Sequence, residues 1–134
     1  MNIEIKSIDE KPIKASELLE LYHNAGWWPE RTEYDLAEML SKTVSVGAWK
    51  DGNLIGFARA VTDGEFRAYI EDVVIHSSFQ KGGTGTELIS RLLEGLTHID
   101  VISLFCEESL IPFYEKNDSK YSKAQYVMHR KQES

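Results

Sequence analysis

The residues best suited to chemistry form a short glycine-rich loop between two apolar segments. The loop consists of Gln80, Lys81, Gly82, Gly83, Thr84, Gly85 and Thr86. Glycine lets the backbone take positive φ values and approach a ligand closely. Threonine hydroxyls add hydrogen-bond donors, and the lysine adds positive charge. Such a loop suits a phosphate group when a helix follows it, because the first N–H groups of a helix have no partner inside it.

The segments on either side of the loop read as the elements that would hold it in place. Residues 70–75 form an apolar, β-branched run, which predicts a strand. Residues 100–105 predict a second strand. Between the loop and the second strand, apolar residues recur at helical spacing, namely Leu88, Ile89, Leu92, Leu93 and Leu96. Strand, helix and strand then form a βαβ unit, so we expect its two strands to be parallel.

Two nucleotide-binding loops and an ordinary turn are the alternatives. A P-loop closes its glycine stretch with Gly-Lys and a hydroxyl residue, whereas Lys81 precedes the glycines. A Rossmann loop carries Gly-x-Gly-x-x-Gly early in the chain, and that pattern is absent. The interpretation of the chain as a nucleotide-phosphate-binding protein is therefore supported by the loop alone. A plain glycine-rich turn is the third alternative, and the flanking elements argue against it.

The spacing Gln80-x-x-Gly83-x-Gly85 resembles the coenzyme A loop of the GNAT acyl-CoA N-acyltransferases. In that family an Arg or Gln, two spacers, Gly, one spacer and Gly or Ala wrap the pyrophosphate of coenzyme A. The pair Phe113-Tyr114 also resembles the family's Phe-Tyr helix motif, at about the expected distance along the chain. The resemblance covers nearly the whole chain.

Two positions depart from the family pattern. The family usually continues with Gly-Phe after the lysine of the helix motif, where this chain has Asn117-Asp118. It also often has Asn near the end of the preceding strand, where this chain has Glu107. These departures motivate an alternative function, a non-catalytic acyl-CoA-binding regulator with the GNAT fold.

The resemblance implies where acetyl-CoA binds. Backbone groups of Val73, Val74 and Ile75 would pair with the amides of the pantetheine arm, as if the cofactor were an added strand. The pyrophosphate would lie on the N–H groups of residues 81–86, with the hydroxyls of Thr84 and Thr86 as further donors.

Acyl transfer to an amine needs a proton acceptor for an ammonium of pKa ~10.4 and a proton donor for a thiolate of pKa ~8.5. The resemblance implies that Tyr114 is the donor; its alternative role is packing beside Phe113. Strand alternation places Tyr69, Glu71, Val73 and Ile75 on one face and Ala68, Ile70, Asp72 and Val74 on the other. Glu71 is therefore our candidate base, directly or through water, and Asp72 is the reserve. The alternative for either carboxylate is a simple ion pair with Arg59 or Arg67.

Three aromatic residues, Trp27, Trp28 and Tyr34, lie where the resemblance implies the acceptor site. They predict that the acceptor is an aromatic amine or that its site has a hydrophobic rim. The alternative is that these side chains cover the hydrophobic core. Cys106 ends a predicted strand, which is typical of a buried small apolar group and argues against an acyl-cysteine intermediate. The four histidines have no metal-ligand spacing, so we assign no metal.

The composition limits both the organisation and the partners of the chain. Its 134 residues predict a single domain over 1–134, and 42% hydrophobic residues suffice for a core. A net charge of −7 argues against nucleic acid as a partner. No run is apolar enough for a membrane span or a signal peptide, so we expect a cytoplasmic protein. One cysteine allows no internal disulfide. A homodimer is implied by the resemblance alone.

The remaining segments complete a predicted α/β fold. We expect a strand over 2–8, a helix over 15–25 ended by Gly26, and a helix over 32–41 with a capping box at Thr32 and Asp35. Strands over 43–49, 54–61 and 67–75 form an antiparallel meander with turns at Asp51-Gly52 and Asp63-Gly64. A short helix over 109–116, with Ser109 as its N-cap, and a last strand over 121–129 follow. The fold class is a single-domain GNAT-like α/β fold, with a mixed central sheet and helices on both faces.

Together these features predict an N-acetyltransferase. It would move the acetyl group of acetyl-CoA to a primary amine on a small molecule, by direct transfer within a ternary complex.

Overall fold

A computed structural model describes residues 2–117, 119–120 and 122–132 of the chain. One sheet has the strand order β1 (Ile3–Ser7), β2 (Val44–Lys50), β3 (Asn53–Thr62), β4 (Arg67–Ile75) and β5 (Val101–Leu104). The helices are α1 (Ala15–Ala25), α2 (Glu33–Leu40), α3 (Thr84–Glu94) and α4 (Ile111–Lys116), and the short 3-10 helices η1 (Ser77–Phe79) and η2 (Glu108–Leu110) precede α3 and α4. Strands β1 to β4 are antiparallel neighbours and β5 is parallel to β4. The predicted meander, βαβ unit and mixed sheet are confirmed.

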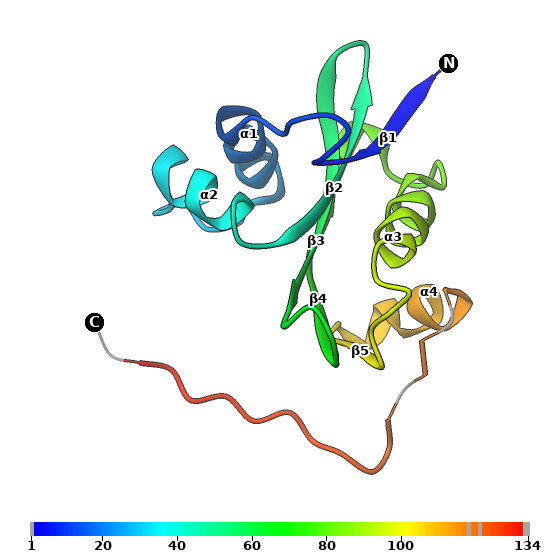
Figure 1. The fold of residues 1–134 in the computed structure, drawn as a ribbon. Coiled ribbons are helices and arrows are strands. Elements are labelled where there is room, and N and C mark those ends of the chain that lie inside the picture. The colour runs from blue at the N-terminus through cyan, green and yellow to red at the C-terminus, as the bar shows by residue number, and fades with distance from the viewer. Residues whose placement is uncertain (1, 118, 121, 133–134) are drawn as a thin grey trace.

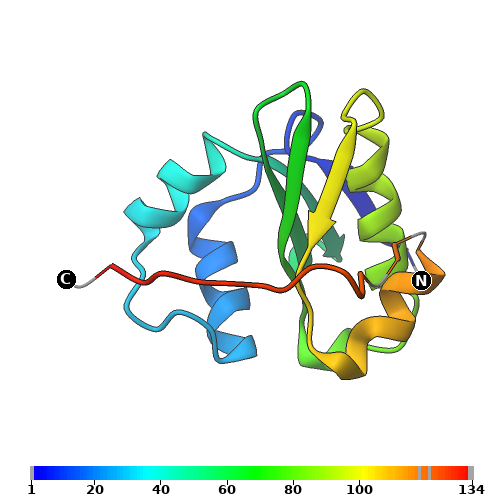
Figure 2. The same ribbon diagram turned by 90° about the horizontal axis from the view of Figure 1, so that it is seen from below.

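Helices cover both faces of the sheet, as Figures 1 and 2 show. Helices α1 and α2 lie on one face, and α3 lies on the other with α4 beside it. Each face has its own core. The α3 cluster contains Leu88, Ile89, Leu92 and Leu96, which are the predicted apolar stripe of that helix. The cluster under α1 and α2 contains Leu18, Leu21, Tyr22, Leu36 and Phe57.

The helix ends and turns follow from the residue types at these positions. Gly26 ends α1 in the left-handed conformation, with φ 76°. Thr32 and Asp35 form the predicted capping box: Asp35 N–H donates to Thr32 Oγ1 at 3.2 Å, and Thr32 N–H donates to Asp35 Oδ2 at 2.9 Å. The turn at Asp51-Gly52 has positive φ at both residues, which suits a tight hairpin. The N-cap of α4 is Leu110, not Ser109, because Ser109 belongs to the preceding turn η2.

The prediction of a last strand over 121–129 is wrong for residues 122–129, which form no strand; Tyr121 lies outside the described residues. The segment passes beneath the domain as an extended chain (Figures 1 and 2). Tyr126 and Met128 are 90% and 91% exposed, so the apolar residues that predicted a strand have no face to bury on. The segment touches the domain where the ring of His129 lies 6.1 Å from the ring of Phe105. An apolar run forms a strand only where the edge of a sheet can pair with its backbone N–H and C=O groups.

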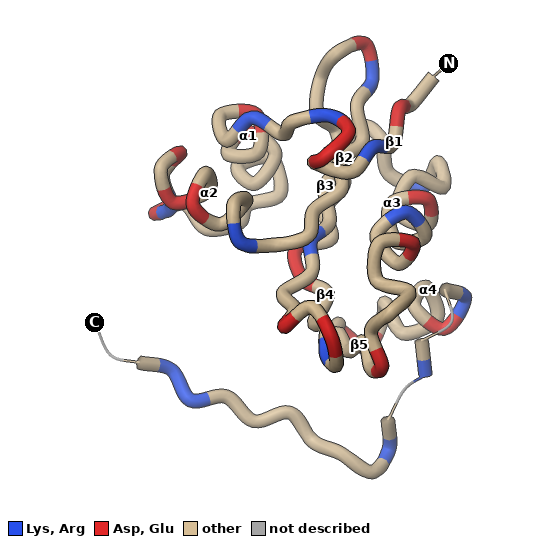
Figure 3. Tube along the Cα trace, viewed as in Figure 1, with Lys and Arg blue, Asp and Glu red and all other residues tan. Residues whose placement is uncertain are grey.

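Charge is unevenly distributed along the chain, as Figure 3 shows. The described residues after α4 carry basic but no acidic side chains, and the basic ones are Lys120, Lys123, Arg130 and Lys131. The excess of acidic residues therefore belongs to the folded part before them. No helix among the described residues has the length and apolarity that crossing a membrane requires.

The capping box gives a test of how α2 begins. We expect Thr32→Ala to lower the free energy of unfolding by about 1 kcal/mol, because the first turn of α2 loses a hydrogen-bond acceptor. Urea denaturation measures the change. Ser16→Ala is the control, since Ser16 is exposed in α1 and caps no helix. Equal stability of both variants would contradict the role of the box.

Candidate active site

Strands β4 and β5 separate beyond Ile70. Their parallel register runs from Arg67 opposite Val101 to Ile70 opposite Leu104. Strand β4 continues to Ile75, still paired with β3 on its other side. Within the described residues, no strand pairs with the outer edge of β4 over 71–75. This stretch is the predicted pantetheine edge, and its backbone groups can accept an added strand.

A β-bulge at Asp72 changes which side chains face each way along β4. Glu71 is opposite Arg59 and Val74 is opposite Phe57, so Asp72 and Val73 share one position in the register. Asp72 has φ 57°, in the left-handed region. The predicted alternation is therefore wrong beyond Glu71. Val73 and Ile75 pack with Ala68 and Ile70 against the α3 cluster, whereas Val74 packs under α1 and α2, as the cluster members show.

The bulge is held by a buried network of charged and polar groups. Arg59 Nε donates to Asp72 Oδ2 at 2.7 Å, and Arg59 Nη2 donates to Glu71 Oε2 at 3.1 Å. Tyr22 Oη, from α1, donates to the same Asp72 Oδ2 at 2.9 Å. The Arg59 side chain is 9% exposed and that of Asp72 only 5%. Both candidate carboxylates thus pair with Arg59, and Asp72 is the more deeply buried.

Tyr22 is a permanent donor in this network. Burial raises the pKa of its phenol, and the neighbouring Asp72 carboxylate raises it further. The hydroxyl therefore keeps its proton throughout the physiological range. The sequence alone did not predict a role for Tyr22, and Arg59 was considered only as an ion-pair partner of Glu71 or Asp72. The signal in the sequence was Arg59, the charged residue inside the apolar run of β3. A buried charge needs a partner, so this residue indicated a buried ion pair.

A cavity of about 340 Å³ opens beside the network, lined by Gly26, Trp27, Trp28 and Asp72. The end of α1 next to the cavity is tied to η1, because Asn24 Oδ1 accepts a hydrogen bond from Ser77 N–H at 3.0 Å. The structure thus brings two of the predicted acceptor residues next to a candidate carboxylate.

The three predicted aromatic residues differ in their surroundings. Trp27 packs against Tyr22, with ring centroids 5.9 Å apart. Trp28 takes φ 48°, and the guanidinium of Arg31 lies over its ring, 4.0 Å from the centroid. Tyr34 is 73% exposed on α2 and does not line the cavity.

The glycine loop has the geometry expected for an anion site. Gly83 is the N-cap of α3, in the left-handed conformation with φ 85°. The first helical hydrogen bond runs from Glu87 N–H to Gly83, so the N–H groups of residues 84–86 have no partner within the helix. Gln80 donates to the Ile75 carbonyl at 3.2 Å, which ties the loop to the end of β4. Of the two hydroxyl residues, Thr86 is exposed and Thr84 is buried.

Helix α4 packs against the start of α3 at Gly85. A Cβ at Gly85 would lie 3.3 Å from Phe113 Cζ, so only glycine leaves comfortable room for that ring. Phe113 and Tyr114 stack edge to face, with centroids 4.9 Å apart, and both pack against the α3 cluster. Burial raises the pKa of Tyr114, with a further contribution from Cys106. Asn117 Nδ2 donates to the Phe113 carbonyl at 2.8 Å, closing α4 where the family pattern has glycine.

Cys106 was expected to be buried, and this expectation is wrong because it is exposed just after β5. Partial burial still raises the pKa of its thiol, which disfavours the thiolate that a nucleophile needs. Among the described residues, no group of three or more His, Cys, Asp and Glu side chains could hold a metal ion.

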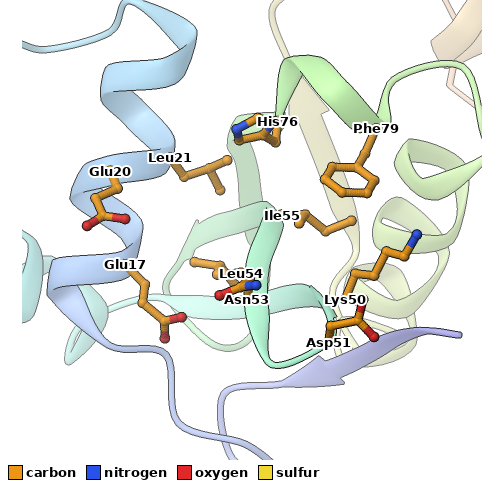
Figure 4. Close-up of a pocket in the computed structure, with 10 residues that line it drawn as sticks. All are labelled: Glu17, Glu20, Leu21, Lys50, Asp51, Asn53, Leu54, Ile55, His76 and Phe79. Carbon is orange, nitrogen blue, oxygen red and sulfur yellow. The ribbon is translucent and has the colours of Figure 1, made fainter.

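A second, larger cavity of about 530 Å³ lies between α1, the β2–β3 hairpin and the segment after β4 (Figure 4). Glu17 and Glu20 reach it from α1, Lys50 from the end of β2, and Asp51 from the turn that follows. His76, just after β4, also lines it. None of its lining residues is among the predicted site residues.

The Arg59 network can be tested through stability. We expect Arg59→Met to lower the free energy of unfolding by about 3–5 kcal/mol, because it leaves buried Asp72 without its cation. Arg91→Met is the matched control, since Arg91 pairs with Glu10 and Glu94 at the surface, where such pairs contribute about 0–1 kcal/mol. Urea denaturation compares the two variants, and similar losses would contradict a structural role for the buried pair.

Comparison with known proteins agrees with this geometry. Residues 13–118 match the model of the Acetyltransferase (GNAT) family. The chain is 38% identical over 123 residues to ycf52 of Pyropia yezoensis, an uncharacterized N-acetyltransferase, and the match covers 85% of this chain and 71% of that protein.

Two solved structures share the fold. A protein of unknown function from Staphylococcus aureus superposes with a TM-score of 0.83 at 19% identity, covering 98% of this chain and 100% of that one. A GNAT-family acetyltransferase from Streptococcus pneumoniae gives a TM-score of 0.79 at 24% identity, covering 97% of this chain and 100% of that one. The family match over most of the chain, together with the relative from Pyropia, identifies this protein as a member of the GNAT acetyltransferase family.

Proposed function

We propose that the protein is an N-acetyltransferase that moves the acetyl group of acetyl-CoA to a primary amine on a small molecule, by direct transfer within a ternary complex. The observation that carries the proposal is the outer edge of β4. It lacks a strand partner over 71–75 within the described residues, and it leads directly into the glycine loop at the start of α3. An extended, amide-bearing molecule that ends in a pyrophosphate fits both features in that order.

The residues present fit acetyl-CoA at each of these positions. Backbone groups of Val73, Val74 and Ile75 would pair with the pantetheine amides. The pyrophosphate would lie on the N–H groups of residues 81–86, with Lys81 and Gln80 beside it. The left-handed conformation of Gly83 turns the chain into α3, so that the free N–H groups at the helix start point out of the loop. Acetyl-CoA, when bound, supplies an activated thioester.

The chain's own residues would then manage the protons of the transfer. The acceptor arrives as an ammonium ion and must lose a proton before its nitrogen can attack the thioester carbonyl. Glu71 is the proposed base, directly or through a water molecule, with Asp72 as the reserve. As the new C–N bond forms and the C–S bond breaks, Tyr114 would protonate the departing thiolate, and the second proton that the nitrogen loses would restore the phenol through solvent. Its raised pKa suits this role, because the phenol keeps its proton at neutral pH.

The cavity beside Asp72 is the proposed acceptor site. Trp27 and Trp28 provide apolar walls, and its volume of about 340 Å³ suits a small molecule. Tyr34 would border the site only from outside the cavity, since it is exposed on α2.

The proposed function is tested directly by calorimetry with acetyl-CoA and by thiol release with a panel of amines. We expect binding of acetyl-CoA and amine-dependent thiol release. Binding without release by any amine would support the alternative, a non-catalytic acyl-CoA-binding regulator. Binding of ATP in place of acetyl-CoA would overturn the proposal.

The glycine loop has its own test. We expect Gly83→Asp to abolish acetyl-CoA binding, because it places a carboxylate where the pyrophosphate would lie. Gly64→Asp is a closely matched control: both glycines have φ 85° and open space around them, but Gly64 lies in the turn before β4. Calorimetry should find unchanged affinity for the Gly64 variant. Retained affinity in the Gly83 variant would show that the loop does not bind the phosphates.

The role of Tyr114 as the acid can be separated from its packing. We expect Tyr114→Phe to lower kcat by about 10²-fold or more while acetyl-CoA affinity is unchanged, because phenylalanine keeps the ring contact with Phe113. In the wild type, the loss of kcat caused by deprotonation of Tyr114 should be centred above pH 10, because burial raises the pKa of its phenol above the usual value of 10.0. Tyr126→Phe, in the exposed C-terminal segment, is the control. An unchanged kcat would remove Tyr114 as the acid.

A further inference from the structure

The short turn η1 joins the end of β4 to the glycine loop, and one imidazole caps its start. His76 is the N-cap of η1, and its ring nitrogen Nδ1 accepts a hydrogen bond from Ser78 N–H at 3.1 Å. The ring also lies edge to face against Phe79, with centroids 5.8 Å apart. One side chain, to which the proposed transfer assigns no role, therefore contacts the middle and the end of the turn that leads into the glycine loop.

The direction of this hydrogen bond determines the charge of the imidazole. The donor is a backbone N–H, so Nδ1 of His76 must be the acceptor and carries no proton. When the ring gains a second proton, both of its nitrogens become donors, and the bond from Ser78 N–H is lost. Histidine is the side chain whose charge ordinarily changes between about pH 5 and 8. The cap therefore exists only on the alkaline side of that change.

We propose that His76 is a positioning residue for acetyl-CoA. Its neutral imidazole holds η1 in the conformation that presents the glycine loop to the pyrophosphate, and its protonation releases the turn and weakens binding. The inference rests on the proposed function, because acetyl-CoA is the proposed ligand of that loop. It goes beyond that function by making the affinity for acetyl-CoA depend on pH through a residue outside the loop.

Three further hydrogen bonds connect η1 with the strands and with the loop. His76 N–H donates to the Ile55 carbonyl at 2.7 Å, which joins the start of the turn to β3. Phe79 N–H donates to the His76 carbonyl at 2.9 Å and closes the turn. Gln80 Nε2 donates to the Ile75 carbonyl at 3.2 Å. Because Gln80 is also the first residue of the loop motif, a change at the cap reaches the loop within a few residues.

The backbone of the loop depends on support from its neighbours. Lys81 and Gly83 both take left-handed values, with φ 72° and 85°. For lysine this conformation is unfavourable, and it persists only where the surrounding structure holds it. The capped turn lies on one side of Lys81 and α3 follows on the other. Release of the turn therefore lowers the fraction of molecules with a binding-competent loop, and the apparent affinity falls by that fraction.

The charged groups around His76 come from α1 and from the β2–β3 hairpin. Glu17 and Glu20 line the larger cavity from α1, and Lys50 and Asp51 line it from the hairpin (Figure 4). Carboxyl and ammonium groups ordinarily change their charge below and above the range of imidazole. Among these groups, a dependence between about pH 5 and 8 therefore points to the imidazole.

Calorimetry with acetyl-CoA at about pH 7.5 and about pH 5.5 tests the proposal. His76→Asn is the conservative variant, because asparagine is a preferred N-cap and does not titrate. It should match the affinity of the wild type at the higher pH. At the lower pH the wild type should bind about fivefold or more weakly than this variant, the factor that corresponds to a capping hydrogen bond of about 1 kcal/mol. The comparison also cancels the titration of the ligand's own phosphates.

His76→Ala separates the cap from other uses of the side chain. Alanine offers no acceptor at either pH, so this variant should bind acetyl-CoA about fivefold more weakly than the wild type at about pH 7.5. Its pH dependence should equal that of His76→Asn. The matched control is His98→Asn, since the ring of His98 bonds the Gly64 carbonyl at 3.1 Å, in the turn between β3 and β4. That variant should keep the pH dependence of the wild type.

Three outcomes would overturn the proposal. The first is an affinity that depends on pH equally in the wild type and in His76→Asn. The second is an equal loss of affinity in His76→Asn and His76→Ala at about pH 7.5, which would indicate packing and not a cap. The third is a pH dependence that disappears in His98→Asn. Thermal denaturation at both pH values establishes that each variant is folded.

The Ser78 amide gives a readout that needs no ligand. In NMR spectra of the unliganded wild type, its proton shift should change as the imidazole gains a proton, and in His76→Asn it should not. If no acetyl-CoA binds at either pH but the Ser78 shift behaves in this way, the transferase proposal fails and the His76 cap holds. If acetyl-CoA binds and thiol is released, but both proteins depend equally on pH, the transferase proposal holds and the positioning role fails.

Discussion

The buried pair between Arg59 and Asp72 is the interaction on which the candidate site depends. Asp72 adopts a left-handed backbone conformation, which is unfavourable for a residue with a side chain, and its carboxylate is almost completely removed from water. The guanidinium of Arg59, 2.7 Å away, and the hydroxyl of Tyr22 compensate that burial. Through these two bonds β3, β4 and α1 meet at Asp72, and the bulge is held in the wall of the cavity.

The bulge also links the two halves of the site. Before it, β4 has β5 as a partner; beyond it, the outer edge is open within the described residues and leads to the glycine loop. The same edge therefore carries the carboxylates on its α1 side and the free backbone groups that suit a pantetheine arm. On the other face of the sheet, Gly85 lets Phe113 approach the start of α3, and Tyr114 packs with Phe113 against the α3 cluster. The proposed acid, the proposed base and the proposed phosphate loop thus lie on one strand and on the helices packed around it.

Much of this arrangement could be read from local patterns. The apolar stripe of α3, the capping box at Thr32, Gly26 at the end of α1 and the turn at Asp51-Gly52 each depend on a few neighbouring residues, and each was predicted correctly. The face assignment beyond Glu71 failed because strand alternation assumes a regular pleat, and a bulge adds one residue. The strand over 121–129 failed in its described part because no sheet edge receives it, and Tyr22 was missed because its partner is 50 positions away.

The sequence by itself determined the order of the helices and strands up to α4, the glycine loop with its family spacing, and the α/β class. These follow from periodicity and from backbone preferences that act over a few residues. Only the tertiary structure decided which carboxylate is buried, which groups pair with it, and which aromatic residues share its cavity. Those properties arise where β3, β4 and the end of α1 come together, and the energy of a buried charge depends on partners that no local pattern specifies.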